Sequence, residues 1–177
     1  DNLLILNDIK KNNLGNIFFL DRNKIKNIID SNSLVENYKI FKKYPSSINI
    51  NIQKTDFLAK INKNGKIYLI GSNGKFIDNK YSNNDLPFIF GNPEIYEFLQ
   101  FKEKIDQSQM DFKKIKNIFF YQSKRWDIVF KNNLTIKLPN DFTIETLNSS
   151  LKFINNSNIK KNKIIDLRVK NQIITNE

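Results

Sequence analysis

The stretch Lys163-Ile-Ile-Asp-Leu-Arg-Val-Lys-Asn-Gln-Ile-Ile-Thr175 contains two short β-prone runs. In the first run, apolar residues alternate with charged residues, so one face is apolar and the other is charged, as in a half-buried strand. The polar link from Lys170 to Gln172 separates this run from the second one, Ile173–Thr175. Two strands joined by so short a link pair as antiparallel neighbours, and we expect the outer strand to lie at the border of its sheet.

A border strand presents backbone N–H and C=O groups without a neighbour, and another protein can add a strand to it. Ile173 and Ile174 point to opposite faces of such a strand, so we expect one to be buried and the other to be accessible, without knowing which. Arg168 could pair with a partner's carboxylate or with Asp166, two residues earlier on the same face. The candidate functional site is therefore this edge.

The composition argues against an active site. The 177 residues include no Cys and no His, which excludes disulfides and thiolate sites and removes the usual general base and the commonest metal ligand. Asp and Glu remain, but no paired-carboxylate motif and no glycine-rich phosphate loop stands out. We expect a protein that is not an enzyme, with no cofactor and no small-molecule substrate.

The net charge of +11 allows two interpretations. The first is binding to nucleic acid or to an anionic membrane. The second is a gene rich in A and T, which makes Lys, Asn and Ile abundant everywhere. The lysines occur as scattered pairs, such as Lys10-Lys11 and Lys113-Lys114, rather than as one run. We favour the second interpretation and expect no nucleic-acid partner.

Hydropathy predicts no membrane span in this sequence. No stretch approaches the roughly 20 apolar residues that a transmembrane helix needs. The chain opens on Asp1 without a basic flank, so no signal peptide is recognisable. A fragment cut from a membrane-anchored protein would have the same features.

The first fifty residues predict a small α+β unit. Apolar residues at helical spacing predict helices over 2–9 and from a cap at Asp21 to about residue 30. Val35–Tyr44 reads as a strand, and Ile48–Gln53 alternates apolar and polar residues as a second strand. We expect the isoleucines of that second strand to lie in the core.

From Thr55 onward the pattern changes to short strands, which predict an antiparallel sheet with two helices. The helices are expected over Pro93–Lys104, with Asn92 as the N-cap, and over Phe142–Ile154. Trp126 is expected in the core because Ile128 and Phe130 share its face. The expected strands before the terminal pair include Phe57–Ile61, Lys66–Ile70, Leu86–Phe90, Ile115–Tyr121, Trp126–Phe130 and Leu134–Leu138.

These segments resemble the bacterial cell-division family FtsQ (DivIB), in the right order over nearly the whole chain. Its C-terminal signature is matched by Arg125-Trp126-Asp127, Ile136-Lys137-Leu138-Pro139 and Ile165-Asp166-Leu167-Arg168. Its POTRA domain is matched by Asn16-Ile17-Phe18-Phe19-Leu20-Asp21, Leu34-Val35-Glu36 and Lys43-Tyr44-Pro45-Ser46-Ser47-Ile48. Gln53-Lys54-Thr55-Asp56 departs from the family, which usually has Glu-Arg before a Pro there.

The resemblance implies an α+β fold, with a small POTRA-like domain over 1–54 followed by a larger antiparallel β domain with flanking helices over 55–177. It implies a non-enzymatic scaffold at the division septum, anchored in the inner membrane by a single span, with this part in the periplasm. The first POTRA strand, the span and the cytoplasmic tail would precede Asp1. The implied partners are FtsB and FtsL, and the implied role is to help regulate septal peptidoglycan synthesis.

The resemblance also implies the residues that contact FtsB, which adds a strand to the last strand of the β domain. They are Lys124, Arg168, Val169, Lys170, Ile173, Ile174 and Thr175. A second interpretation is a POTRA-bearing module of outer-membrane assembly or secretion that binds substrate strands by the same edge. Such modules usually repeat or lead into a barrel, and the second half of this sequence predicts neither.

Overall fold

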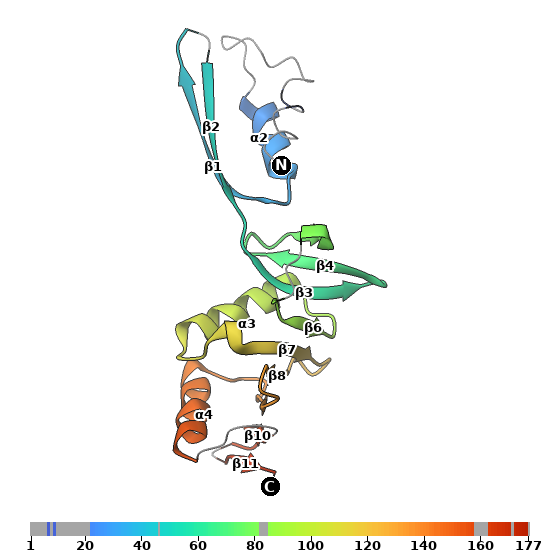
Figure 1. Cartoon of the computed structure of the whole chain (residues 1–177), viewed down its shortest axis with the longest axis vertical. Coiled ribbons are helices and arrows are strands. Elements are labelled where there is room, and N and C mark those ends of the chain that lie inside the picture. The colour runs from blue at the N-terminus through green and yellow to red at the C-terminus, as the bar shows by residue number, and fades with distance from the viewer. Residues whose placement is uncertain are drawn as a thin grey trace. The chain divides into compact units, whose positions relative to one another are not determined.

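The structure is a computed structural model that describes residues 7, 9, 22–45, 47–81, 85–157, 163–170 and 172–176. The chain divides into two compact units. The N-terminal unit comprises Asp1–Asp56 together with Gly71–Ile77, and the C-terminal unit comprises Phe57–Ile70 and Asp78–Glu177 (Figure 1). Nine residues that follow Lys54 group with the first unit, namely Thr55, Asp56 and Gly71–Ile77, and the boundary expected at Lys54 stays a prediction.

The N-terminal unit packs one helix against a two-stranded sheet. Helix α2 spans Arg22–Ser31, and strands β1 (Val35–Lys43) and β2 (Ser47–Lys54) pair antiparallel. Its buried centre consists of Ile25, Ile29 and Val35. The isoleucines of β2 pack against this centre but are only half-buried, so the alternating pattern predicted the face that they occupy and overestimated their burial. The helix expected over 2–9 and the cap at Asp21 lie outside the described residues, apart from 7 and 9.

The remaining strands form one nine-stranded sheet in the order β11-β10-β9-β8-β7-β6-β3-β4-β5. Their bounds are β3 Phe57–Lys63, β4 Lys66–Gly71, β5 Phe76–Asp78, β6 Phe88–Phe90, β7 Ile115–Phe120, β8 Trp126–Phe130, β9 Thr135–Lys137, β10 Ile164–Asp166 and β11 Ile174–Thr175. Two short 3-10 turns, Asn79–Tyr81 and Phe112–Lys114, join the elements.

The sheet is mixed, whereas the sequence predicted an antiparallel one. Strands β3 and β6, β6 and β7, and β9 and β10 pair in parallel. Two of these pairs are joined through helices, because α3 (Ile95–Gln107) lies between β6 and β7 and α4 (Ile144–Asn156) lies between β9 and β10. A helical crossover returns the chain in the same direction, so the helices themselves cause the parallel pairing.

Both helices begin two residues later than predicted. For α3, the carboxylate of Glu97 accepts the backbone N–H of Glu94 at 2.9 Å, so Glu94 takes the cap position expected for Asn92. For α4, Thr143 is the N-cap, and it exchanges side-chain and backbone hydrogen bonds with Thr146 at 3.2 and 3.3 Å. Among the described residues, no helix is long and apolar enough to cross a membrane.

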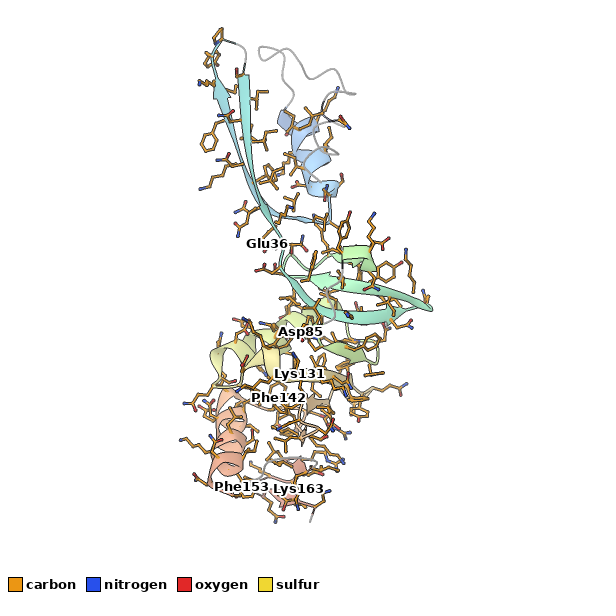
Figure 2. The ribbon with its side chains drawn as sticks, viewed as in Figure 1. Glu36, Asp85, Lys131, Phe142, Phe153 and Lys163 are labelled. Carbon is orange, nitrogen blue, oxygen red and sulfur yellow. The ribbon has the colours of Figure 1, made fainter. Side chains whose placement is uncertain are left out.

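A row of isoleucines forms the centre of the C-terminal unit. Each of six neighbouring strands contributes one in-register isoleucine, and none is more than 1% exposed: Ile61, Ile89, Ile118, Ile128, Ile136 and Ile165. Helices α3 and α4 lie on one side of these strands (Figure 1). On the isoleucine face, Trp126 stacks on Phe101 of α3 at 4.5 Å between ring centres, and Phe101 also contacts Phe142, which Figure 2 labels. Trp126 is buried, as predicted.

Candidate interaction edge

Strand β11 lies at one border of the nine-stranded sheet, as far as the structure describes the chain. It pairs antiparallel with β10, in the register Ile165 to Thr175 and Asp166 to Ile174, which confirms the antiparallel terminal pair. At the opposite border, most of β5 groups with the N-terminal unit. Among the described residues, β11 pairs with a strand on one side only, where its neighbour is β10.

The register shows which backbone groups of β11 point outward. The N–H of Asn176 donates to the carbonyl of Ile164 at 3.4 Å. Hydrogen-bonded and non-bonded pairs alternate along an antiparallel ladder, so Asp166 and Ile174 form the next bonded pair, and Ile165 and Thr175 form a non-bonded pair. The N–H and C=O of Thr175 therefore point away from β10.

Two side-chain contacts fasten the end of β11 to β10. The side-chain oxygen of Asn176 accepts the backbone N–H of Ile164 at 2.6 Å. Lys163, labelled in Figure 2, donates from Nζ to the carbonyl of Asn176 at 3.2 Å. These bonds join the end of β11 to β10, so the backbone of β11 is held in an extended conformation with its outward groups unchanged.

Three apolar side chains of this region are exposed. Val169 is 45% exposed, Ile173 is 38% exposed and Ile174 is 48% exposed. The expectation that one of the two isoleucines would be buried is wrong. Ile174 lies in register with Asp166 on the face opposite the isoleucine row, and Ile173 precedes β11, where it lines a cavity beside α4.

That cavity has a volume of about 550 Å³ and lies between the beginning of α4 and the segment that links β10 to β11. Four of the predicted contact residues line it: Arg168, Val169, Lys170 and Ile173. Asp141 and Glu145 line its other wall. The site thus combines an outward-facing strand, an apolar recess and charges of both signs.

Arg168 is already paired within the chain. Its Nε lies 2.8 and 2.9 Å from the two carboxylate oxygens of Asp166, its backbone N–H donates to Oδ1 at 3.1 Å, and Nη2 also contacts Oδ2. The side-chain bond from Arg168 lowers the pKa of the Asp166 carboxyl. Of the two pairings that the sequence left open, the structure contains the internal one.

Lys124 is paired as well, and it does not line the cavity. It sits in the turn between β7 and β8 with a positive φ of 63°. Its Nζ lies 2.5 Å from Oε1 of Glu97 on α3, and this bond is the main cause of a lowered pKa of Glu97. The Nζ also lies 5.6 Å from the centre of the Phe120 ring.

A buried carboxylate on β8, three strands inward from β11, was not singled out from the sequence. Asp127 is 3% exposed and faces away from the isoleucine row. It accepts hydrogen bonds from the hydroxyl of Tyr121 at 3.1 Å and from Nε of Arg125 at 3.3 Å. The guanidinium of Arg125 also lies 4.2 Å from the centre of the Tyr121 ring. Burial and then the charge of Asp127 raise the pKa of Tyr121.

Asp127 begins a row of alternating charge that leads to the border strand. Its register neighbours are Lys137 on β9 and then Asp166 on β10, followed by Ile174 on β11. The sequence contained a signal for this row, because Asp127, Lys137 and Asp166 each occupy the polar position of a β-type alternation. The strand order was needed to place them side by side.

The described residues contain no group of side chains that could hold a metal ion.

Comparison with known proteins identifies the family. The family model described as "Cell division protein FtsQ/DivIB, C-terminal" matches residues 59–168. The chain belongs to the FtsQ/DivIB family. The model described as "POTRA domain, FtsQ-type" matches residues 4–54. These matches confirm the resemblance and the α+β class, and the family that they identify is one of cell-division proteins.

One relative of this FtsQ/DivIB chain is the cell division protein DivIB of Clostridium tetani (strain Massachusetts / E88). It is 36% identical over 76 residues, which are 43% of this chain and 29% of that protein. The match thus spans less than a third of the relative's length. The solved major extracytoplasmic domain of the trans isomer of DivIB from Geobacillus stearothermophilus matches with a TM-score of 0.40 and 11% identity, over 56% of this chain and 87% of that one.

Proposed function

We propose that this chain is a non-enzymatic scaffold of the division machinery that binds FtsB and FtsL at the septum. FtsB would add a strand to β11, and the complex would help regulate septal peptidoglycan synthesis. The observation that carries the proposal is the outward direction of the N–H and C=O of Thr175 on a border strand. Family membership supports the cell-division setting.

The added strand would gain most of its affinity from main-chain hydrogen bonds, and side chains would set the specificity. Val169, Ile173 and Ile174 offer apolar surface next to β11. Lys124 is already paired with Glu97, and Arg168 is already paired with Asp166. A carboxylate of the partner would therefore share each cation with that internal carboxylate. Lys170 completes the set of proposed contacts.

We place this part of the protein on the extracytoplasmic side of a membrane, which is the periplasm in a cell with an inner membrane. A single membrane span elsewhere in the full-length protein would anchor it. The support is the family resemblance.

The test is a titration of the chain with the extracytoplasmic segment of its own FtsB. Thr175→Pro removes the outward N–H and adds a ring at the edge, so we expect affinity to fall at least about tenfold. Thr175→Val keeps the N–H and a β-branched side chain, so it should bind like the unchanged chain. Thermal unfolding should be similar in all three proteins.

A contrasting variant is Ile174→Pro, because the N–H of Ile174 faces β10 according to the register. We expect this variant to loosen β11 itself, which faster hydrogen exchange at Asn176 would report. If Thr175→Pro or deletion of 173–177 leaves a folded protein with unchanged affinity, the partner binds elsewhere and the proposal is wrong.

A further inference from the structure

The loop between β4 and β5 makes hydrogen bonds to segments that lie far away in the sequence. The side-chain nitrogen of Asn73 donates to the carbonyls of Ser33 at 3.0 Å and Val35 at 2.8 Å, which lie 40 and 38 residues earlier. The side-chain oxygen of Asn73 accepts the N–H of Lys75 at 3.0 Å. Its backbone N–H donates to Oγ1 of Thr55 at 3.2 Å. Asn73 thus joins the loop to the start of β1 and to the residue that follows β2.

Ser72 adds a second set of bonds at the same place. Its hydroxyl donates to Oε2 of Glu36 at 2.7 Å; Figure 2 labels Glu36. The hydroxyl oxygen of Ser72 also lies 3.0 Å from Oγ1 of Thr55 and accepts the N–H of Asp56 at 3.0 Å. Thr55 is 6% exposed, so these bonds satisfy a polar group that is shielded from water.

Lys75 completes the end of helix α2. Its Nζ donates to the carbonyls of Asp30 at 2.6 Å and Asn32 at 3.4 Å. The last carbonyls of a helix have no partner within the helix, and a lysine side chain is one of the groups that can bind them. The loop therefore bonds to α2 as well as to the hairpin.

The loop is built for this close approach. A Cβ atom on Gly71 would lie 2.6 Å from Oδ1 of Asn73 and 2.8 Å from Oγ1 of Thr55. Both distances are shorter than real Cβ contacts allow, so any larger residue at position 71 would push Asn73 away from its acceptors.

We propose that Gly71–Ile77 completes the N-terminal unit and that Asn73 is the latch that holds it. The unit is then discontinuous in sequence, because the chain runs through β3 and most of β4 before it supplies these residues. A fragment that ends at Lys54 would lack every donor of the loop and would be less stable than the same unit in the whole chain. Without the side chain of Asn73, the amides of α2, β1 and β2 would consequently be less protected from hydrogen exchange, even though the sequences of these elements are unchanged.

The test is hydrogen exchange on the whole chain with Asn73→Ala. We expect the amide of Thr55, which donates to the carbonyl of Leu34, and the ladder amides of β1 and β2 to exchange at least about tenfold faster. The amide of Leu138, bonded to Trp126 in the C-terminal unit, should change less than about twofold.

The matched control is Asn62→Ala, because Asn62 lies near the end of β3 and its side chain accepts a local bond from the N–H of Gly65 at 2.9 Å. A milder variant, Lys75→Met, removes only the bonds to the end of α2, and it should speed exchange mainly in that helix. The proposal is overturned if the amides of β1 and β2 exchange no faster in Asn73→Ala than in Asn62→Ala. It is also overturned if Lys75→Met leaves the exchange rates of the α2 amides unchanged.

Discussion

Arg168 binds the carboxylate of Asp166 through its side chain and its backbone N–H, so the residue expected to reach for a partner is tied to its own strand. This pairing joins the end of β10 to the beginning of the link that leads to β11. The side chain of Arg168 is still 41% exposed, so the guanidinium can meet a second carboxylate without leaving the first. An exposed pair of this kind contributes little to stability, and its main effect is to fix the position of the cation.

The pH dependence of this pair follows from the lowered pKa of Asp166. A carboxyl whose pKa is lower in the folded state adds stability above its unfolded pKa, and that stability is lost as pH falls through the folded value. We expect NMR titration to place the pKa of Asp166 below the ordinary value of 3.8. In Arg168→Gln it should move back toward that value, and an unchanged pKa would contradict the pairing.

Replacement of Trp126 tests the core of the C-terminal unit. Trp126→Ala removes a buried ring that stacks on Phe101, so we expect a loss of about 3–5 kcal/mol in the free energy of unfolding. Trp126→Phe keeps part of the aromatic contact and should cost less. Chemical denaturation measures both variants. Unchanged stability of Trp126→Ala together with lost partner binding would make Trp126 a surface contact.

Charge-reversal variants distinguish the contributions of Arg168 and Lys170 to partner binding. Arg168→Glu would place a second carboxylate beside Asp166 and repel an acidic partner, so it should weaken FtsB binding more than Lys170→Glu does. The difference should shrink as salt is raised, since exposed charges are screened. Titrations at low and high salt measure it. Equal affinity of both variants and the unchanged chain would show that the partner presents no carboxylate there.

The excess of lysine should confer no nucleic-acid function. Scattered lysines neutralise few phosphates at once, so any DNA binding should be weak and should vanish near physiological salt. Fluorescence anisotropy with a labelled oligonucleotide over a salt series measures this. Sub-micromolar affinity at about 0.15 M salt would contradict the prediction.

Local patterns predicted the elements well. Period-two alternation identified the strands of the first hairpin and the position of Trp126, because alternation records directly which side of a strand is buried. The antiparallel pairing of β10 with β11 followed from the short link between them. These features depend on residues that are close in sequence.

Features that depend on distant segments were missed. The parallel pairs follow from the path through α3 and α4, which no single strand reveals. Helix α3 begins at Ile95 with Glu94 rather than Asn92 as its N-cap, because the side chain of Glu97 accepts the backbone N–H of Glu94. Both Ile173 and Ile174 are exposed because β11 is short and at the border, so alternation did not decide their burial. The contacts of Asn73 reach back 38 and 40 residues.

The isoleucine row stops one strand before the border. Its last member, Ile165, pairs with Thr175, so the row of buried isoleucines ends at β10 and does not include β11. The burial of the isoleucine row therefore does not depend on an isoleucine from β11. A strand that a partner adds to β11, as we propose, would need only to continue the backbone hydrogen bonding and would have no missing isoleucine to supply.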